Sequence, residues 1–520
     1  MSSELLAPLD LAFWHLETAD HPMHLGALAR FDPGPGDPGE VLALLAERAA
    51  AIPRLRMRVR DVLLPVGGAA WSVDTSFDVH RHVRHLRHEP HTPVDPPARP
   101  APHACVDPHT AQATHTAHAT PTAHATPTAQ APHMAQAPHP APSSHERPAD
   151  GGGDDGFTAW ATRLAGELME RPLERGLPPW EMYVLTGEPG GPFAVLVKLH
   201  HALADGMRAV AIGAGIFDEI AGARPARRHR PHPVPPRSWL PGPLNVADAA
   251  RGRIEELGRA LGVGASVVRA SRLDPRGAPS LTAGSSGTRR LATVDLDLEE
   301  VRRVRRVTGG TANDVLLAVV AGGLRQWMLD RGEPLPADDP RALVPVSRRR
   351  PGGAPGPGNT FSAYLLDLPL SDPDPLGRLG AVRRRMDRNK AAGPGRGAGA
   401  VALLADQLPP LAHRFGAPLA QGAARMLFDV LVTNVPLPRS RLSLGGSPLR
   451  ALHPMAPLAR GQALAVAMSP YDGRVHVGLV ADGKAVPDAD RLAAAMAGEL
   501  ADLVKLTDHP DRPAGTGHPD

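Results

Sequence analysis

The chain has 520 residues, of which 42% are hydrophobic and only 3% aromatic, so its cores are expected to consist mainly of Ala, Val and Leu. Lys and Arg number 57 against 54 Asp and Glu, and the small formal charge of +3 gives no indication of a nucleic-acid partner. The single cysteine, Cys105, excludes an internal disulfide and a cysteine-rich zinc site and favours an intracellular protein.

The N-terminal segment lacks the basic start of a signal peptide, and no apolar run reaches the roughly eighteen residues that span a bilayer. Any membrane contact is therefore expected to be peripheral. Hydrophobic periodicity predicts folded structure over residues 1–87. The expected elements are a helix opened by Pro8-Leu9-Asp10, a strand from Met23 to Phe31 and a helix from Gly39 to Ala51.

Residues from about 88 to 155 differ in composition from the rest of the chain. They repeat Ala, Thr, Pro and His with almost no large aliphatic side chain, so they cannot bury enough apolar surface to offset the entropy of ordering. We predict a disordered insertion that interrupts the first domain. Histidine-rich tracts can bind metals, but here no ligand spacing is fixed on a rigid element, so a solvated loop is favoured.

Order is predicted to return with an amphipathic helix from Phe157 to Met169. A hairpin follows, with strands from Trp180 to Leu185 and from Phe193 to Leu199. The second strand leads into His200-His201, and a helix of small apolar residues is expected from Asp205 to Ile220. The two histidines are therefore expected on a strand-to-helix loop, where a scaffold can hold side chains over a cleft.

Residues 224–288 are interpreted as a linker. Its basic segment Arg224–Arg237 and its amphipathic helix, from about residue 246 to 271, are either membrane contacts or an ordinary interdomain connection. A second domain is predicted over 289–508, followed by a disordered tail at 509–520. Its expected elements are the strand Arg290–Leu296, helices Leu298–Val307 and Thr311–Arg325, strands Leu343–Val346 and Ser362–Leu368, helix Leu376–Asn389, hairpin strands Ala463–Ser469 and Arg474–Val480, and helix Asp488–Leu503.

Strands and helices are mixed in both halves, which predicts an α/β or α+β fold with two domains of similar size, 1–223 and 289–508. The chain has no phosphate-binding loop and no Gly-x-Gly-x-x-Gly after a strand. It also lacks the Gly-x-Ser-x-Gly of a serine hydrolase and the His-Glu-x-x-His of a metal hydrolase. We therefore expect no metal and no covalent serine chemistry.

The segment from His200 to Gly206 is the strongest candidate for chemistry. A neutral imidazole near pH 7 can take a proton from a hydroxyl, so one histidine is a candidate base and the other a packing or orienting residue. Asp205 can fix the loop, and Gly206 permits its turn. The alternative is that both histidines are ordinary hydrogen-bonded residues at a strand end. Asn313-Asp314 is predicted to cap a helix, and a buried cap could also shape a tunnel.

At these residues the chain resembles the bacterial wax ester synthase/diacylglycerol acyltransferase family. Apart from the insertion at 88–155, and Leu281–Gly287 in place of the family's usual Leu-Asn-Gly-Pro, the blocks follow the family's order. They are Pro8-Leu9-Asp10, Phe13, Leu16-Glu17, Pro22–Gly26, Phe77-Asp78, His82–Arg84, Arg171–Gly176, Pro179–Glu181, His200–Gly206, Asn313-Asp314, Pro345–Ser347, Gly358-Asn359, Thr433–Pro436 and Ser469–Gly473.

The resemblance implies two domains similar to chloramphenicol acetyltransferase and to peptide-synthetase condensation domains, with the active site in a channel between them. It implies that His201 is the general base and takes the hydroxyl proton of diacylglycerol or a long-chain alcohol. That oxygen then attacks the thioester of acyl-coenzyme A, a co-substrate, with no other cofactor and no covalent intermediate. His200, Asp205 and Gly206 would support the loop, and Asn313 and Asp314 would be supporting residues.

The expected products are triacylglycerol or wax esters, made in the cytoplasm at the inner face of the membrane or at lipid droplets. Two alternatives stay open at this point. One is acyl transfer from a carrier protein's pantetheine arm, as in condensation domains. The other is a non-catalytic lipid-binding or droplet-coating protein with the same fold.

Overall fold

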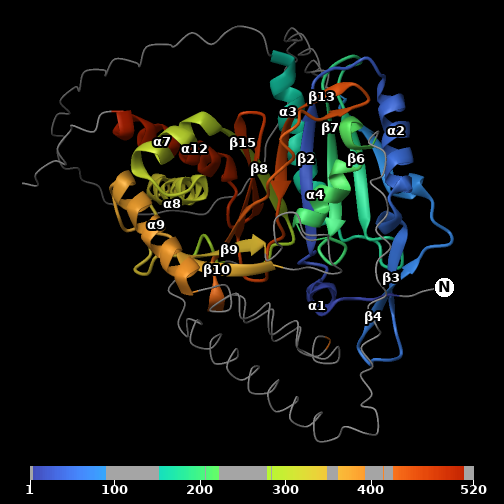
Figure 1. The fold of residues 1–520 in the computed structure, drawn as a ribbon, viewed down its shortest axis with the longest axis horizontal. Helices are drawn as coiled ribbons and strands as arrows, with labels where there is room; N and C mark the ends of the chain where they lie inside the picture. Colours follow the sequence, from blue (N-terminus) through green and yellow to red (C-terminus); the bar gives the residue numbers. More distant parts are fainter. Residues whose placement is uncertain are drawn as a thin grey trace, which may run out of the picture. The chain divides into compact units, whose positions relative to one another are not determined.

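The structure, a computed structural model, describes residues 4–89, 152–204, 206–221, 278–282, 284–347, 361–392, 414 and 426–508. Strands and helices are both abundant in these ranges (Figure 1), so the predicted mixed α/β class is confirmed. Several predictions fall outside the described residues: nearly all of the insertion at 88–155, the linker segments Arg224–Arg237 and 246–271, and the tail at 509–520.

The first of two six-stranded sheets has the order β12-β13-β2-β7-β6-β5. Its central strands β2 and β7 pair antiparallel, which sets His24 opposite His200. Two of its strands, β12 and β13, come from the C-terminal half of the chain, so the first half alone does not complete this sheet. The bounds are β2 His24–Phe31, β5 Val83–Arg87, β6 Trp180–Thr186, β7 Phe193–His200, β12 Ser443–Leu444 and β13 Ser447–Met455.

Helices pack on both faces of this sheet. Alternate residues of β7 face opposite sides. Val195 packs in one core cluster with α2 (Pro38–Ala51), and Leu196 packs in another with α3 (Gly152–Glu170). The sequence also fixes where α2 begins, because Asp37 and Glu40 form a reciprocal capping box.

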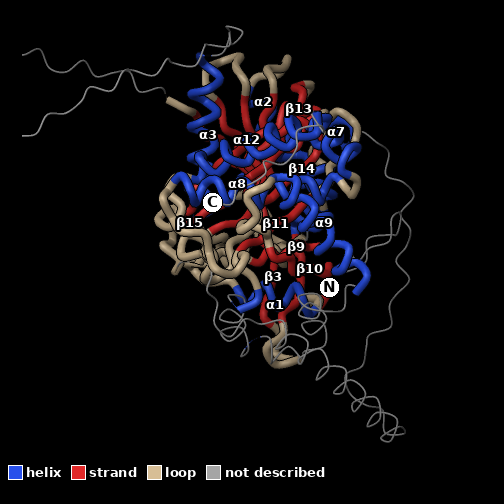
Figure 2. The backbone as a smooth tube through the Cα atoms, turned by 90° about the vertical axis from the view of Figure 1, so that its left-hand side faces the viewer, coloured by secondary structure: helices blue, strands red, loops and turns tan. Residues whose placement is uncertain are grey.

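The second six-stranded sheet has the order β10-β9-β11-β14-β15-β8. Four helices from the C-terminal half gather beside it (Figures 1 and 2) and share one large core with it. The strand bounds are β8 Arg289–Asp297, β9 Arg341–Ser347, β10 Phe361–Asp367, β11 Val430–Asn434, β14 Leu464–Tyr471 and β15 Arg474–Asp482. The helices are α7 Leu298–Thr308, α8 Ala312–Asp330, α9 Pro375–Ala392 and α12 Ala489–Asp508.

A buried polar cluster joins the two sheets. Asp295 Oδ1 on β8 lies 2.8 Å from His453 Nε2 on β13 and 2.7 Å from His476 Nδ1 on β15. Both imidazoles are almost fully buried. These residues could also act as metal ligands. However, both distances are those of direct hydrogen bonds, and about 3.3 Å would separate two ligands bound to one zinc ion. The cluster is therefore a hydrogen-bonded connection between β13 and the second sheet.

One predicted helix is wrong in its extent. Asp205–Ile220 was expected as a single helix, but the structure has α4 (Gly206–Ala214) and a short α5 (Asp218–Ala221). The break is stabilised from outside the segment, since Arg48 on α2 donates to Ile216 O and to Asp218 Oδ1, both at 2.6 Å. The residue that stabilises the end of α4 therefore comes from α2, far away in the sequence, and the local pattern of residues 205–220 does not reveal it.

Among the described helices, none is by itself long and apolar enough to cross a membrane. Only when α7 and α8 are taken together do they reach the length and apolar composition of a membrane span, and the two helices are bent by 104° relative to each other.

Candidate active site

The histidine motif occupies the turn between β7 and α4, as the sequence predicted. His200 is the last residue of β7, and residues 201–203 form a turn before α4 begins at Gly206. Backbone hydrogen bonds hold the turn from two sides: His201 N donates to Met23 O at 2.8 Å, and His200 N donates to Pro179 O at 3.0 Å. The turn is therefore anchored to the start of β2 and to the segment before β6.

The two histidines of the motif have different environments. His200 is almost fully buried, and its Nδ1 accepts a hydrogen bond from Ala202 N at 2.9 Å. In the neutral ring, that bond assigns the proton to Nε2, which lies 3.4 Å from Glu17 Oε1. His200 therefore connects the turn to a carboxylate behind it, and it does not line the cavity described below.

His201, in contrast, lines a cavity. Its ring stacks on Phe13 with the ring centroids 3.8 Å apart and the planes 22° apart. Phe13 belongs to α1 (Pro8–Leu16). The N-terminal helix therefore supports one face of the imidazole, and the ring is held at the cavity wall.

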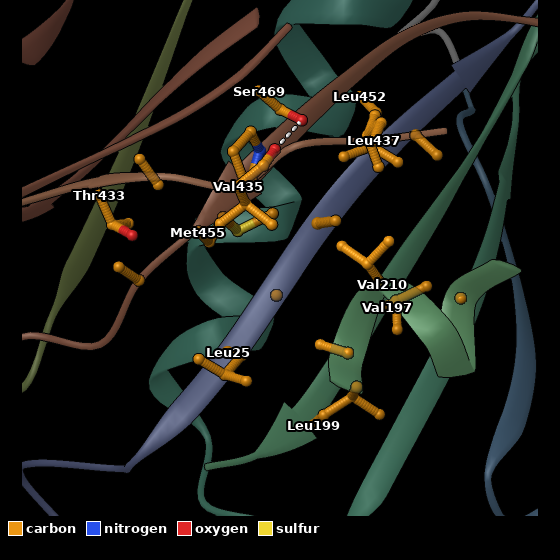
Figure 3. Close-up of a pocket in the computed structure, with 18 of the residues that line it drawn as sticks. Leu25, Val197, Leu199, Val210, Thr433, Val435, Leu437, Leu452, Met455 and Ser469 are labelled. Atoms are coloured by element: carbon orange, nitrogen blue, oxygen red, sulfur yellow. Dashed lines mark hydrogen bonds between the residues drawn. The ribbon is translucent and has the colours of Figure 1, made fainter. Parts of the chain in front are cut away.

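The cavity measures about 300 Å³ and is lined mainly by apolar side chains. Figure 3 shows Leu25, Val197, Leu199 and Val210 on one side, from β2, β7 and α4, and residues from the C-terminal half on the other. The polar side chains in the lining are His201, Thr433, Asn434 and Ser469, and Ser469 Oγ donates to Val435 O at 2.7 Å. Such a lining suits an aliphatic chain with its polar end near a few fixed groups.

Glu17 is the centre of a buried charged network behind the motif. Its side chain is 5% exposed, and its Oε1 lies 3.3 Å from His24 Nε2 as well as 3.4 Å from His200 Nε2. Arg175 Nη2 donates to Glu17 Oε2 at 2.7 Å, and the same guanidinium stacks over Trp14 at 3.8 Å. One carboxylate thus ties α1, β2, β7 and the loop before β6 together.

The charge states in this network follow from burial and hydrogen bonding. Burial alone opposes ionisation of Glu17, but the imidazoles of His200 and His24 beside its Oε1 outweigh it and hold the pKa of the carboxyl below its usual range. Burial lowers the pKa of His24 from 6.5 to about 4. Near neutral pH the network therefore consists of an ionised Glu17, a charged Arg175 and a neutral His24.

We expect the free energy of unfolding to decrease as the pH falls from about 6.5 to 4. The neutral form of His24 belongs to the folded state, so its contribution is complete above the unfolded pKa and is lost as the pH falls through the folded one. The difference between the unfolded and folded pKa of His24 corresponds to about 3 kcal/mol of unfolding free energy. Urea unfolding at a series of pH values, compared between the wild type and His24→Gln, measures this contribution. A difference that does not change with pH would contradict it.

The other predicted site residues lie elsewhere or outside the described part of the chain. Asp205 is not among the described residues, and Gly206 is the first residue of α4. Asn313 and Asp314 lie at the start of α8 and do not line the cavity. The helix is capped by Thr311, whose N donates to Asp314 Oδ2 at 2.8 Å, so Asp314 is the third residue of the helix and closes a capping box with Thr311.

Two parts of the site were not found by reasoning from the sequence. Glu17 and Arg175 were noted only within the blocks of the family resemblance, because their contact joins positions far apart in the chain. Thr433 and Asn434 follow from the same resemblance, but β11, which carries them, was not predicted. An acidic residue placed directly after an apolar helix is a weak local signal for a buried carboxylate.

Comparison with known proteins gives the site its context. The family model described as the wax ester synthase/diacylglycerol acyltransferase catalytic domain matches residues 6–93 and 158–316, and the model of the WS/DGAT C-terminal domain matches 357–504. The chain belongs to the wax ester synthase/diacylglycerol acyltransferase family. It is accordingly an acyltransferase of this family, and the resemblance noted in the sequence is confirmed.

Relatives of similar length support the assignment. A Mycobacterium tuberculosis protein named "Probable diacyglycerol O-acyltransferase tgs1" is 28% identical over 510 residues, which covers 96% of each chain. A second protein from that organism, named as the acyltransferase tgs2, is 26% identical over 515 residues and covers 96% of this chain and 98% of its own.

Solved structures share the fold. The wax ester synthase/diacylglycerol acyltransferase of Marinobacter aquaeolei VT8 matches with a TM-score of 0.61 at 21% identity, over 97% of this chain and all of that one. The first condensation domain of the calcium-dependent antibiotic synthetase matches with a TM-score of 0.53 at 14% identity, over 98% of both. The predicted likeness to condensation domains is therefore confirmed at the level of the fold.

Proposed function

We propose that the protein transfers an acyl chain from acyl-coenzyme A to the hydroxyl of diacylglycerol or of a long-chain alcohol, with His201 as general base. The products are triacylglycerol or wax ester. The observation that carries the proposal is that, of the two motif histidines, His201 lines the apolar cavity while His200 is fixed behind it. The names of the relatives support a diacylglycerol acceptor.

The chemistry needs one base. The neutral imidazole of His201 takes the hydroxyl proton as the acceptor oxygen attacks the thioester carbonyl, so a C–O bond forms and His201 becomes an imidazolium. The tetrahedral intermediate then collapses, the C–S bond breaks, and the proton passes to the leaving thiolate of coenzyme A. No acyl-enzyme is formed, and the reaction requires no metal and no prosthetic group.

Other residues act by holding this base. Phe13 supports the imidazole face of His201, and Glu17 with His200 fixes the turn from behind. We assign loop support to Asp205 and Gly206 as well. Asn313 and Asp314 act at a distance, through the start of α8.

The cavity volume limits what enters beside His201. At about 300 Å³ it lies at the lower end of small-molecule sites, which span roughly 300–1,000 Å³. It therefore receives part of one aliphatic chain, and the rest of a diacylglycerol stays outside. A substrate of this kind dissolves in lipid, which supports a peripheral location at the inner face of the membrane or at lipid droplets.

We expect Val210→Phe to shift acyl transfer toward shorter chains. Val210 projects into the cavity from α4 (Figure 3), and the larger ring would occupy space that a chain uses. Competition between short- and long-chain acyl-coenzyme A in one reaction measures the preference. Val307→Phe, at an exposed position on α7, is the matched control. Unchanged preference in Val210→Phe would show that this cavity does not hold the reacting chain.

The assay that tests the function follows release of free coenzyme A with a panel of diacylglycerols and long-chain alcohols, and identifies the esters formed. Condensation domains share the fold, so acyl groups on a carrier protein's pantetheine are offered as a second donor. Turnover with free acyl-coenzyme A supports the proposal. Turnover with carrier-bound donor alone would favour the condensation-like reaction, and no turnover with either would favour a lipid-binding protein.

A further inference from the structure

Exposed apolar side chains are concentrated in one small part of the described chain. The seven large hydrophobic residues with the most exposure include five on the three-stranded sheet β1-β4-β3 and its hairpin loop. In the loop between β3 (Met57–Asp61) and β4 (Ala69–Val73), Leu63 is 92% exposed, Leu64 65% and Val66 58%. The remaining two of the five are Leu5, on β1 (Glu4–Leu5), and Val73 on β4.

The loop is held in shape by its own backbone. Gly68 N donates to Pro65 O at 2.8 Å, and Val62 N donates to Gly68 O at 3.1 Å. His15 Nε2 lies 3.1 Å from Gly67 O, which ties the loop to α1. Three large aliphatic side chains are thus presented to solvent by an ordered hairpin. Exposure of these side chains to water is energetically unfavourable, so solvation does not explain why the loop presents them.

Positive charge lies beside these side chains. Residues 53–74 contain four arginines, Arg54, Arg56, Arg58 and Arg60, against two acids, Asp61 and Asp74, and Arg58 Nη1 lies 3.6 Å from Asp74 Oδ1. Arg56 and Arg60 are exposed. On the neighbouring strand β1, Glu4 is the acidic residue. An apolar tip with basic residues at its base matches an anionic lipid surface, in which acyl chains lie beneath negative headgroups.

The hairpin is also connected to the candidate active site. His15 on α1 contacts the loop, and Phe13, two residues earlier, stacks on His201. Lipid bound at the hairpin would therefore lie on the side of α1, the helix that supports the base.

We propose that the β3–β4 hairpin, through Leu63, Leu64 and Val66, is the part of the protein that inserts into an anionic phospholipid surface. The inference rests on the proposed function in one respect, since a lipophilic acceptor has to be collected from a lipid phase. It adds the place of contact and the chemistry of the partner. Val307 and Leu329, the other exposed large hydrophobic residues, lie apart on α7 and α8 and supply internal controls.

The test is co-sedimentation of the full chain with vesicles of phosphatidylcholine alone and of phosphatidylcholine mixed with phosphatidylglycerol. Transfer of one leucine from water to an apolar phase corresponds to about tenfold in a partition constant. We expect Leu63→Ser/Leu64→Ser to weaken binding at least about tenfold and Leu329→Ser to bind like the wild type. Arg56→Gln/Arg60→Gln should reduce the preference for phosphatidylglycerol.

A second measurement reports contact with lipid directly and does not rely on a variant with weakened vesicle binding. In a Cys105→Ser background, an environment-sensitive dye on Leu63→Cys should shift to the blue when anionic vesicles are added, and the same dye on Leu329→Cys should not. Any of three results would overturn the proposal. They are wild-type protein that binds neither vesicle type, serine variants that bind like the wild type, and a hairpin dye whose emission does not shift. A hairpin that instead mediates self-association without lipid would overturn it too.

Failure here and failure of the proposed function are distinguishable. Vesicle binding is measured without donor or acceptor, and it is expected to be retained by His201→Ala. Wild-type protein that binds neither vesicle type but transfers acyl groups from detergent-dispersed substrates would reject the hairpin proposal alone. Binding without any acyl transfer would reject the proposed reaction alone.

Discussion

Replacement of His201 by alanine is expected to lower kcat for acyl transfer by about 10²–10⁴-fold, the usual contribution of a positioned general base. The imidazole lines the cavity and stacks on Phe13, so it is held where an acceptor hydroxyl would arrive. The replacement should lower kcat more than it changes KM. The base accepts the proton in the transition state, whereas the apolar lining that binds the chain is unchanged.

The measurement is release of coenzyme A under saturating donor and acceptor, with thermal unfolding recorded in parallel. His80→Ala is the matched control, since His80 is exposed on the short helix η2 (Val79–Arg81) away from the motif. Activity of His201→Ala within a few fold of the wild type would remove His201 from the mechanism. The same loss in His80→Ala would show that the assay reports on something other than the base.

Replacement of Glu17 by alanine is expected to have the largest effect on stability. Glu17 is 5% exposed and pairs with Arg175, and removal of one partner of a buried pair typically costs about 3–5 kcal/mol. Because Arg175 is half exposed, the lower end of this range applies. kcat should fall as well, since His200 would lose the group that holds its Nε2 and the turn that carries His201 would loosen.

Chemical unfolding and kcat are measured on Glu17→Ala, Glu17→Gln and Glu174→Gln. Glu174 is also paired with an arginine, Arg81, but on the surface, so its variant should change the free energy of unfolding little. Glutamine at position 17 keeps the shape and an acceptor oxygen, and should restore part of kcat. If Glu17→Gln and Glu17→Ala lose activity equally while both stay folded, the negative charge itself is required. If neither variant changes kcat, Glu17 has no positioning role.

Local elements of the fold could be predicted from the sequence where pattern and packing agree. β2, β6, β7, α7, β14 and β15 were expected within a residue or two of their observed bounds, because each carries a clear period and ends at a turn residue or cap. Asp297, for example, caps α7 through bonds to Glu299 N and Glu300 N. Such signals depend on residues a few positions apart.

Other elements could not be predicted, because distant residues decide them. β13 contains Pro448 and Pro454, which argue against a central strand, yet it pairs with β2 on one side. α4 ends early because Arg48 binds the backbone that follows it. In the site, the motif histidines were predicted, but the distinction between them depends on which ring faces the cavity. The orientation of each ring depends on its contacts in the folded chain: His200 with Ala202 N and Glu17, and His201 with Phe13.

The strand exchange between halves has a consequence for how the chain reaches its native state. Until β13 (Ser447–Met455) has been synthesised, β2 has β7 on one side and no partner for its other edge. An unpaired, largely apolar strand edge is prone to associate with other chains. The amino-terminal half should therefore be poorly soluble when produced alone, and should gain solubility when the carboxy-terminal half is produced in the same cell.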